Sequence, residues 1–289
     1  MTVTSKKTTV VIPALNEESN IGACLEALAN GSLLPAEIIV VDGESYDNTV
    51  RIAQQFGAKV LNNERRTAAA GRNVGWKMVK TDYVAFTDAD CIPDSGWLQC
   101  LEHRLTNDVV DGIAGRVVPR CPRNEYEAYW NHLAWETLMQ FGDDPYPITE
   151  KNIIHSVVTA SCAYRKDALY QLGGFDEWFG NNAEDVDLTW RAIDAGLSLV
   201  YEPNAIVHAS GVLNIAGIRQ KSFRNGVSSS KLQKRYGGTL NFDPNIYRLL
   251  GRTILDKEPN PNKWLDLNEL IWHLLGKYSG SIRFKVINF

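Results

Sequence analysis

The sequence predicts an α/β fold with a mostly parallel sheet flanked by helices, followed by a C-terminal helical extension. Three observations lead to this prediction. Short runs of apolar, often β-branched residues recur along the first part of the chain, segments of helical periodicity separate them, and polar residues cluster directly after the runs. Near-continuous apolar strands that alternate with amphipathic helices are typical of a parallel sheet covered on both faces.

The expected strands and helices alternate in order along the first 120 residues. Strands are expected at residues 8–12, 37–41, 58–61 and 83–86. The first helix would be capped by Asn16 and would bury one face made of Ile21, Cys24, Leu25 and Leu28. Further helices are expected at residues 47–56 and 67–79.

The rest of the chain is less regular and predicts mainly helices, at residues 124–141, 165–172, 185–195 and 264–278. Between residues 219 and 242 there are six Lys or Arg residues and no acid. We therefore expect two halves at 1–120 and 121–215 and a helical extension at 216–289. The first two would form one domain, 1–215.

Composition indicates an ordinary globular protein, with 44% apolar and 22% charged residues. The net charge of −4 argues against nucleic acid as a partner. Five scattered cysteines without a Cys-x-x-Cys pair fit a reducing compartment. The first apolar run stops at Pro13, and the longest uncharged stretch falls short of the roughly 20 residues of a membrane span. The expected location is cytoplasmic, with peripheral contact at the inner membrane face left open.

Polar residues gather at the carboxyl ends of the expected strands, where α/β sheets bind ligands. Asn16 and Glu17 follow the first strand, and Asp88 and Asp90 follow the fourth. Two carboxylates in this position suit Mg²⁺ or Mn²⁺ on a diphosphate. The alternative is a solvated aspartate turn that leads into Pro93.

Asp42 ends the second strand, where its carboxylate could accept a hydrogen bond from a base N–H, and Gly43 would let the backbone approach a ligand. Capping of the next helix would explain Ser45 and Asp47 but leaves Asp42 without a structural role. Neither Gly-x-Gly-x-x-Gly nor a P-loop follows the first strand, which argues against dinucleotide oxidoreductases and P-loop enzymes.

Three acids, Glu184, Asp185 and Asp187, open the helix expected after residue 183. They would complement the helix dipole, or a carboxylate held there could deprotonate an incoming hydroxyl as general base. The residues alone leave both interpretations open.

Six motifs in order resemble those of family 2 glycosyltransferases of the GT-A fold, a Rossmann-like nucleotide-binding architecture, over about residues 8–210. They are Val11-Ile-Pro13-Ala-Leu-Asn16-Glu17, Val41-Asp42-Gly43-x-Ser45-x-Asp47-x-Thr49, Gly71-Arg72-Asn73-x-Gly75, Asp88-Ala-Asp90, Gly173-Gly-Phe175-Asp176-Glu177 and Glu184-Asp185-x-Asp187.

The resemblance implies that 1–120 is the nucleotide-sugar-binding half and 121–215 the acceptor half, and it implies a role for each matching residue. The nucleotide, usually uridine, would be bound by Pro13, Ala14, Glu17, Asp42, Arg72, Asp88 and Ala89. Asp90 would hold the metal, Mn²⁺ or Mg²⁺. His208 would be an additional metal ligand, as a histidine near this position is in some relatives; a structural role for His208 is the alternative. Asp185 would be the general base of an inverting transfer, with Glu184 beside it at the acceptor.

The expected function is therefore transfer of a sugar from a nucleotide sugar, with a UDP-sugar favoured, to a hydroxyl of a saccharide or lipid-linked acceptor in polysaccharide or glycolipid synthesis. A Mg²⁺-dependent nucleotidyltransferase and an inactive nucleotide-binding module are the alternatives. Glu44 departs from the family pattern by adding negative charge beside the base pocket. The absence of a Gln-x-x-Arg-Trp motif argues against a processive synthase.

Two segments late in the chain have no single interpretation. The basic residues 219–235 could close over the diphosphate, meet anionic lipid or form a solvated helix. The apolar face from Trp264 to Leu275 would serve a homodimer or a membrane surface equally well.

Overall fold

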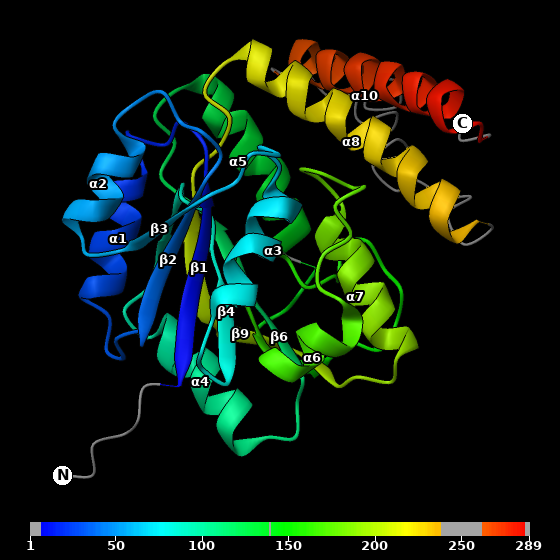
Figure 1. Cartoon of the computed structure of the whole chain (residues 1–289). Helices are drawn as coiled ribbons and strands as arrows, with labels where there is room; N and C mark the ends of the chain where they lie inside the picture. The colour runs from blue at the N-terminus through cyan, green and yellow to red at the C-terminus, as the bar shows by residue number, and fades with distance from the viewer. Residues whose placement is uncertain (1–6, 139, 238–261, 287–289) are drawn as a thin grey trace, which may run out of the picture. The chain divides into compact units, whose positions relative to one another are not determined.

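The computed structural model describes residues 7–138, 140–237 and 262–286. Within these ranges one sheet of nine strands has the order β3-β2-β1-β4-β8-β6-β9-β5, with β7 paired to β9 (Figure 1). The strands are β1 Thr8–Ala14, β2 Glu37–Asp42, β3 Lys59–Asn62, β4 Tyr83–Phe86, β5 Cys91–Pro93, β6 Gly112–Pro119, β7 Tyr146–Pro147, β8 Cys162–Arg165 and β9 Leu199–Ala209. The helices are α1 Ile21–Ala29, α2 Thr49–Gln55, α3 Ala68–Met78, α4 Trp97–Asn107, α5 Glu125–Leu138, α6 Lys166–Leu172, α7 Glu184–Asp194, α8 Ile215–Tyr236 and α10 Lys263–Phe284.

The four strands expected from the sequence are all present, and β1, β2, β3 and β4 run parallel to one another. The second half of the sheet is mixed. β8 lies antiparallel between β4 and β6, whereas β6 and β9 are parallel. The antiparallel β8 joins the two halves into one continuous hydrogen-bonded sheet.

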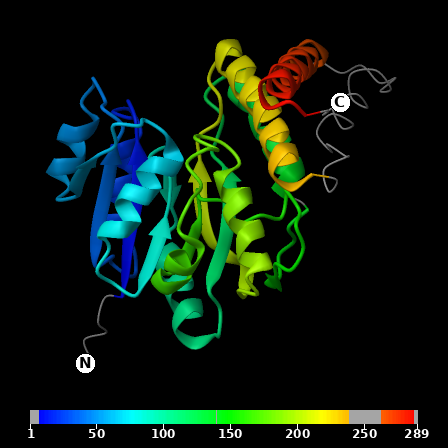
Figure 2. The same ribbon diagram turned by 45° about the vertical axis from the view of Figure 1, so that its right-hand side comes forward.

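Alternate residues of β1 face two separate apolar layers. Val10 and Ile12 pack with Leu25 of α1 in one buried cluster. Val11 packs with Trp76 of α3 in the other. Figures 1 and 2 show α1 and α3 on opposite faces of the sheet, as expected for a sheet covered on both sides.

Close approach of α3 to the sheet requires a glycine. A Cβ atom on Gly75 would lie 2.3 Å from Cγ1 of Val11 and 3.1 Å from Cγ2 of Val41. The helix that carries Arg72 therefore sits directly on β1 and β2, which fixes the depth at which its polar side chains meet the strand ends.

The start of the first helix differs from the sequence-based expectation. α1 begins at Ile21 with Asn20 at its N-cap, so Asn16 is not the capping residue. Asn16 instead has a φ of 57°, and its Oδ1 accepts a hydrogen bond from the Tyr46 backbone N–H at 3.0 Å. Its side chain is used to connect two loops, a long-range role that local helix signals do not reveal.

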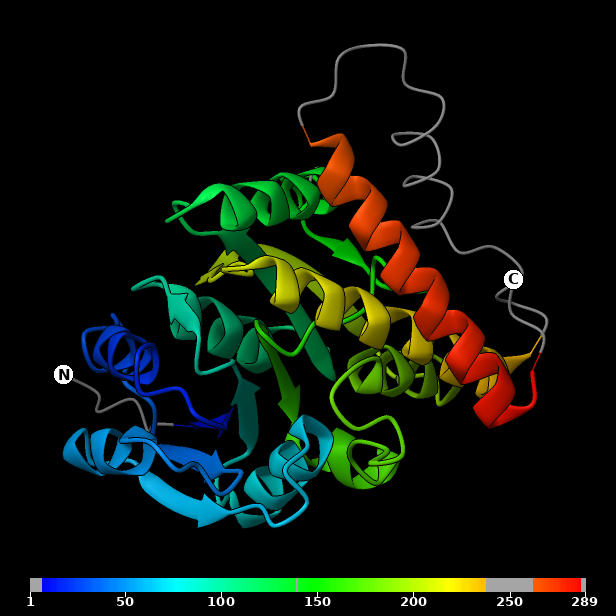
Figure 3. The same ribbon diagram turned by 90° about the horizontal axis from the view of Figure 1, so that it is seen from above.

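The chain forms two compact units, residues 1–120 with 135–210 and residues 121–134 with 211–289. Residues 121–134, grouped with the acceptor half in the sequence analysis, thus belong with the C-terminal helices. In this second unit α8 and α10 lie side by side (Figures 1 and 3). Residues 238–242 of the basic stretch lie outside the described residues. Among the described helices, none combines the length and apolarity needed to cross a bilayer.

Candidate functional site

Hydrogen bonds connect the loop after β1 to the loop after β2. The Asn16 backbone N–H donates to Ser45 Oγ at 2.8 Å, and the Glu17 backbone N–H donates to Thr49 Oγ1 at 2.7 Å. Ser45 therefore serves the loop connection and does not cap α2, whose N-cap is Asn48. The two loops form one unit at the carboxyl ends of the strands, where ligands bind in such sheets.

Asp42 is the last residue of β2, where the second of these two loops begins. In the parallel register it pairs with Ala14, next to the pair of Pro13 with Val41. Its side chain is almost fully buried, and Oδ2 accepts a hydrogen bond from the Ser45 backbone N–H at 3.0 Å. Oδ1 is buried without a hydrogen-bond partner among the described residues. Since a buried polar atom left without a partner is costly, this oxygen is suited to accept a hydrogen bond from a ligand.

Glu44, which departs from the family pattern, is paired with a cation. Arg66 Nε donates to its carboxylate at 2.7 Å. Both residues have positive φ, 61° for Glu44 and 56° for Arg66. The negative charge that the sequence adds beside the pocket is thus compensated by an arginine 22 positions further along the chain.

Arg72 joins the end of β4 to the start of α7. Its side chain is 3% exposed and donates to Asp88 Oδ1 at 2.7 Å and to Glu184 Oε1 at 2.6 Å. The guanidinium carbon lies 5.8 Å from the centre of the Phe175 ring. The resemblance places Arg72 at the base; here it links the aspartate after β4 to the acidic start of α7.

The three acids at the start of α7 have different surroundings. Asp187 is fully buried and bonds Arg191 at 2.7 Å, one turn further along the same helix, which is a structural role. Glu184 is buried against Arg72, and its Oε2 has no hydrogen-bond partner among the described residues. Asp185 is partly exposed, and its Oδ1 accepts from the Val186 backbone N–H. The ion pair with Arg72 therefore gives Glu184 a role beyond complementing the helix N-terminus.

The backbone before α7 is also unusual. Ala183 has a φ of 68°, in the left-handed region that non-glycine residues seldom occupy. Conformations of this kind persist where the surrounding structure holds them, often at functional sites. Here the bend immediately precedes Glu184 and Asp185.

Burial shifts the titration of the carboxylates at this end of the sheet. It raises the pKa of Glu184 to about 7, although the Arg72 charge acts in the opposite direction. Burial also raises the pKa of Asp185. The pKa of Glu17 is raised to about 6, first by burial and further by the charges of Asp90 and Asp88. Carboxylates with raised pKa values are better proton acceptors near neutral pH.

The segment after β4 brings together side chains that could hold a cation. Ligand atoms of Asp88, Asp90 and Cys91 all lie within 4.8 Å of one another. Both aspartates are partly exposed, whereas Ala89 between them is buried in the core. The two carboxylates fit Mg²⁺ or Mn²⁺. Burial raises the pKa of Cys91 well above its usual value, so its thiol stays protonated and is a poor ligand for these ions.

His208 does not lie among these groups. Its Nε2 is 2.9 Å from Oδ1 of Asp94. In the β5–β9 pairing His208 is opposite Ile92, and Ala209 is opposite Cys91. The role of His208 as a metal ligand stays a prediction.

Asn73, to which the sequence analysis gave no separate role, holds the Gly173–Glu177 segment in place. Its Nδ2 donates to the Phe175 carbonyl at 2.8 Å and to Glu177 Oε1 at 2.9 Å. Its Oδ1 accepts from the Phe175 backbone N–H at 2.9 Å. A polar residue on the buried face of an expected helix was the available signal.

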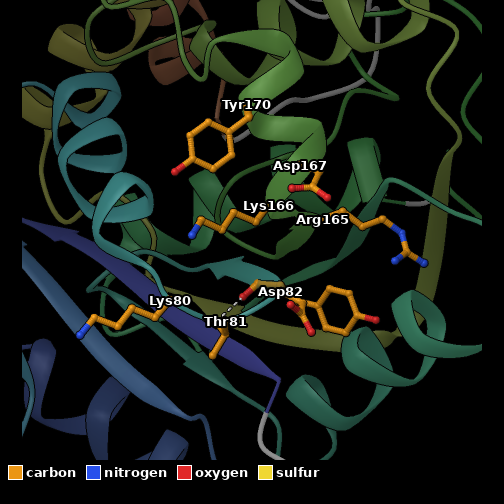
Figure 4. A pocket seen from close by; sticks show the side chains of 8 residues that line it. Lys80, Thr81, Asp82, Arg165, Lys166, Asp167 and Tyr170 are labelled. Carbon is orange, nitrogen blue, oxygen red and sulfur yellow. Dashed lines mark hydrogen bonds between the residues drawn. The ribbon is translucent and has the colours of Figure 1, made fainter.

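A pocket lies at the opposite end of β4, away from these carboxylates (Figure 4). Its lining mixes both signs of charge: Lys80, Asp82, Arg165, Lys166 and Asp167, with Thr81, Tyr83 and Tyr170. The Arg165 guanidinium donates to the carbonyls of Leu105 and Val110. Since the Arg165 guanidinium already bonds these backbone carbonyls, the pocket is a weaker candidate for a ligand site than the carboxylate cluster.

Comparisons with known proteins show the family of this chain. A family model described as "Glycosyl transferase family 2" matches residues 9–173. The pre-mycofactocin glycosyltransferase of Mycobacterium tuberculosis is 33% identical over 207 residues, which cover 69% of this chain and 42% of that protein. This chain thus spans less than half the length of that relative.

Two solved structures have a similar fold. Glucosyl-3-phosphoglycerate synthase from Mycobacterium tuberculosis, in complex with Mn²⁺, UDP and glucosyl-3-phosphoglycerate, matches with a TM-score of 0.59 at 18% identity, over 81% of both chains. A mannosyltransferase from Pyrobaculum calidifontis, in complex with GDP-Man and Mn²⁺, gives 0.58 at 20% identity, over 95% of this chain and 72% of that chain. The predicted fold class, GT-A, is confirmed by these structures.

Proposed function

This chain belongs to glycosyl transferase family 2, and we propose that it transfers a sugar, with inversion, from a UDP-sugar to a hydroxyl of a saccharide or lipid-linked acceptor. The observation that carries the proposal is Arg72, which bonds Asp88 and Glu184 at the same time. It connects the groups suited to a nucleotide diphosphate with those suited to an acceptor hydroxyl.

The donor would bind over the ends of β1, β2 and β4. The free Oδ1 of Asp42 would accept the base N–H, with Pro13, Ala14 and Glu17 beside it on the connected loops. Asp88 and Ala89 would contact the ribose. Mn²⁺ or Mg²⁺, held by Asp90, would neutralise charge on the leaving diphosphate. The two solved structures named above contain Mn²⁺ with UDP or with GDP-Man, which supports this donor class.

The acceptor would approach from the start of α7. Asp185 would take the proton of the attacking hydroxyl as the oxygen bonds to the anomeric carbon and the nucleoside diphosphate leaves on the opposite face. Its partial exposure makes it accessible, and its raised pKa favours proton uptake. Glu184 would lie beside Asp185 at the acceptor, and its ion pair with Arg72 would hold the start of α7 in position.

The first test measures thermal shifts of the full chain with UDP, GDP and dTDP, each with and without Mn²⁺. A shift with UDP that depends on Mn²⁺ is the expected result, because ligands that bind only the folded state raise its stability. A larger shift with GDP would reassign the donor. The absence of a shift with any of them would support the alternative of an inactive module, and release of pyrophosphate from a sugar phosphate and UTP would support a nucleotidyltransferase.

A further inference from the structure

Helix α10 carries its apolar residues on the exposed side. Seven large side chains on this helix are between 43% and 64% exposed: Trp264, Leu267, Ile271, Leu274, Leu275, Tyr278 and Ile282. Their spacing of three and four residues places them along one face. From Trp264 to Ile282 this face extends for about 27 Å at the helical rise of 1.5 Å per residue. We call these seven residues the apolar face of α10.

The opposite side of the helix carries mostly small and polar residues together with Leu265 and Leu270, and the helix packs against α8. A Cβ atom on Gly276 would lie 2.1 Å from the Phe223 carbonyl oxygen, and one on Gly226 would lie 2.1 Å from the His273 carbonyl oxygen. Ser230 Oγ donates to the Lys277 carbonyl at 3.1 Å. The backbones therefore meet through glycine and serine, a type of contact common between helices in lipid.

The acids of α10 are on the buried side as well. The Tyr129 hydroxyl oxygen lies 2.8 Å from Oδ1 of Asp266 and 2.9 Å from Oε2 of Glu269, so both carboxylates face its single O–H donor. Every exposed charged residue described from 263 to 285 is a cation: Lys263, Arg283 and Lys285. α8, packed beside it, has six Lys or Arg residues and no acid. The exposed surface of this helix is thus apolar in the middle and positive at both ends.

We propose that the apolar face of α10 docks on an anionic lipid surface. Apolar side chains in the middle, aromatic residues such as Trp264 and Tyr278, and terminal cations are the features of helices that lie in a membrane interface. Anionic headgroups attract basic segments of this kind. A second copy of the chain is a poorer partner, because cations would meet cations at both ends whether the two helices ran parallel or antiparallel. The proposal does not depend on the identity of the donor or the acceptor.

The test is co-sedimentation of the full chain with vesicles of phosphatidylcholine alone or mixed with phosphatidylglycerol. We expect binding to the mixed vesicles that weakens as salt is raised, because exposed charges are screened. Leu274→Glu should weaken binding about tenfold or more, since it places a charge in the middle of the apolar face. Val109→Glu is the matched control, because Val109 is 95% exposed and lies in the other unit.

Thermal unfolding of each variant shows whether the fold is retained. Lys263→Ala with Arg283→Ala gives a second measure that leaves the apolar face unchanged, and it should reduce the preference for phosphatidylglycerol. The proposal would be overturned if the wild-type chain sedimented equally with phosphatidylcholine vesicles and with vesicles that also contain phosphatidylglycerol. It would also be overturned if sedimentation velocity showed a dimer that Leu274→Glu dissociates while vesicle binding is unchanged, which would assign this face to a second copy.

Discussion

The guanidinium of Arg72 and the carboxylate of Glu184 form a 2.6 Å ion pair in which both side chains are at least 95% buried. The partners are 112 positions apart in the chain. Removing both charges from water is costly, so the pair has to be complete to be tolerated. Arg72 also bonds Asp88, and one residue therefore stabilises two acids that belong to different parts of the site.

Loss of the arginine alone should destabilise the fold. For Arg72→Met we expect the free energy of unfolding to fall by about 3–5 kcal/mol, because Glu184 is left as an uncompensated buried charge. The double variant Arg72→Met/Glu184→Met should recover part of the loss. Urea denaturation of the two single variants and the double variant measures this. Additive losses would show that the two residues are not energetically coupled.

Stability should depend on pH through Glu184. Its pKa is near 4.5 when unfolded and is raised to about 7 in the fold. The folded state therefore binds more protons in between, so stability is highest below pH 4.5 for this group and is lost as pH rises through 7. Glu17 contributes with the same sign up to about pH 6. Between pH 4.5 and 7 the free energy of unfolding should fall less steeply with pH in Glu184→Gln than in the wild type. Identical slopes in the two proteins would contradict the raised pKa of Glu184.

Asp42 is expected to contribute to UDP affinity. Asp42→Ala removes the buried acceptor at the end of β2 and should weaken binding roughly ten- to hundredfold, as expected for about 1.5–3 kcal/mol from one hydrogen bond to a charged group. Asp82→Ala is the control, since Asp82 is exposed at the far end of β4. Calorimetric titration with UDP and Mn²⁺ gives both affinities. Equal affinities would remove Asp42 from the base site.

Two helical glycines should respond in opposite directions to alanine. Gly75→Ala places a methyl group against Val11 and Val41 and should cost about 1–3 kcal/mol by overpacking. Gly22→Ala meets its nearest atom, Cγ2 of Ile52, at an ordinary 3.7 Å and should gain up to about 1 kcal/mol of helix propensity. Thermal or urea unfolding compares them. A stabilised Gly75→Ala variant would mean that α3 can move away from the sheet.

Asp185 and Asp187 should separate rate from stability. Asp185→Asn should lower kcat by about 10²–10⁴ without changing UDP affinity, as expected for loss of a general base. Asp187→Asn loses the buried pair with Arg191 and should lower the unfolding free energy while the folded fraction keeps its rate. Initial-rate assays, UDP titrations and denaturation are needed for each variant. Parallel loss of rate and UDP affinity in Asp185→Asn would contradict its role as base.

The first part of the fold could be predicted because its signals are local. Apolar runs gave β1 to β4, and the helix expected at 67–79 is α3, which Thr67 caps with its side chain. Asp42 and Asp88 come immediately after or at the end of such runs, so their meeting at one edge follows from parallel strands. The strands β6, β8 and β9 lacked an equally clear alternation with helices, and the antiparallel position of β8 depends on pairing between distant segments.

Partners of individual side chains could not be read in the same way. The contacts of Arg72 with Glu184 and of His208 with Asp94 span more than 110 positions each. Which atoms meet depends on strand register and on the seating of a helix, both of which are set by the whole fold. The same holds for Asn16, because its side-chain oxygen can accept a backbone hydrogen bond either at a helix N-cap or from another loop.

The antiparallel pairing of β4 with β8 limits how this protein can acquire new substrates. Phe86 and Cys162 are partners in that pairing, which joins the parallel strands that carry the proposed donor side to the mixed half of the sheet. With donor and acceptor bound as proposed, the sheet would set the spacing between the leaving diphosphate and the attacking hydroxyl. Selection for another sugar or another acceptor would then act on the loops at the strand ends. Loops exchanged between relatives would keep the same distance between donor and acceptor.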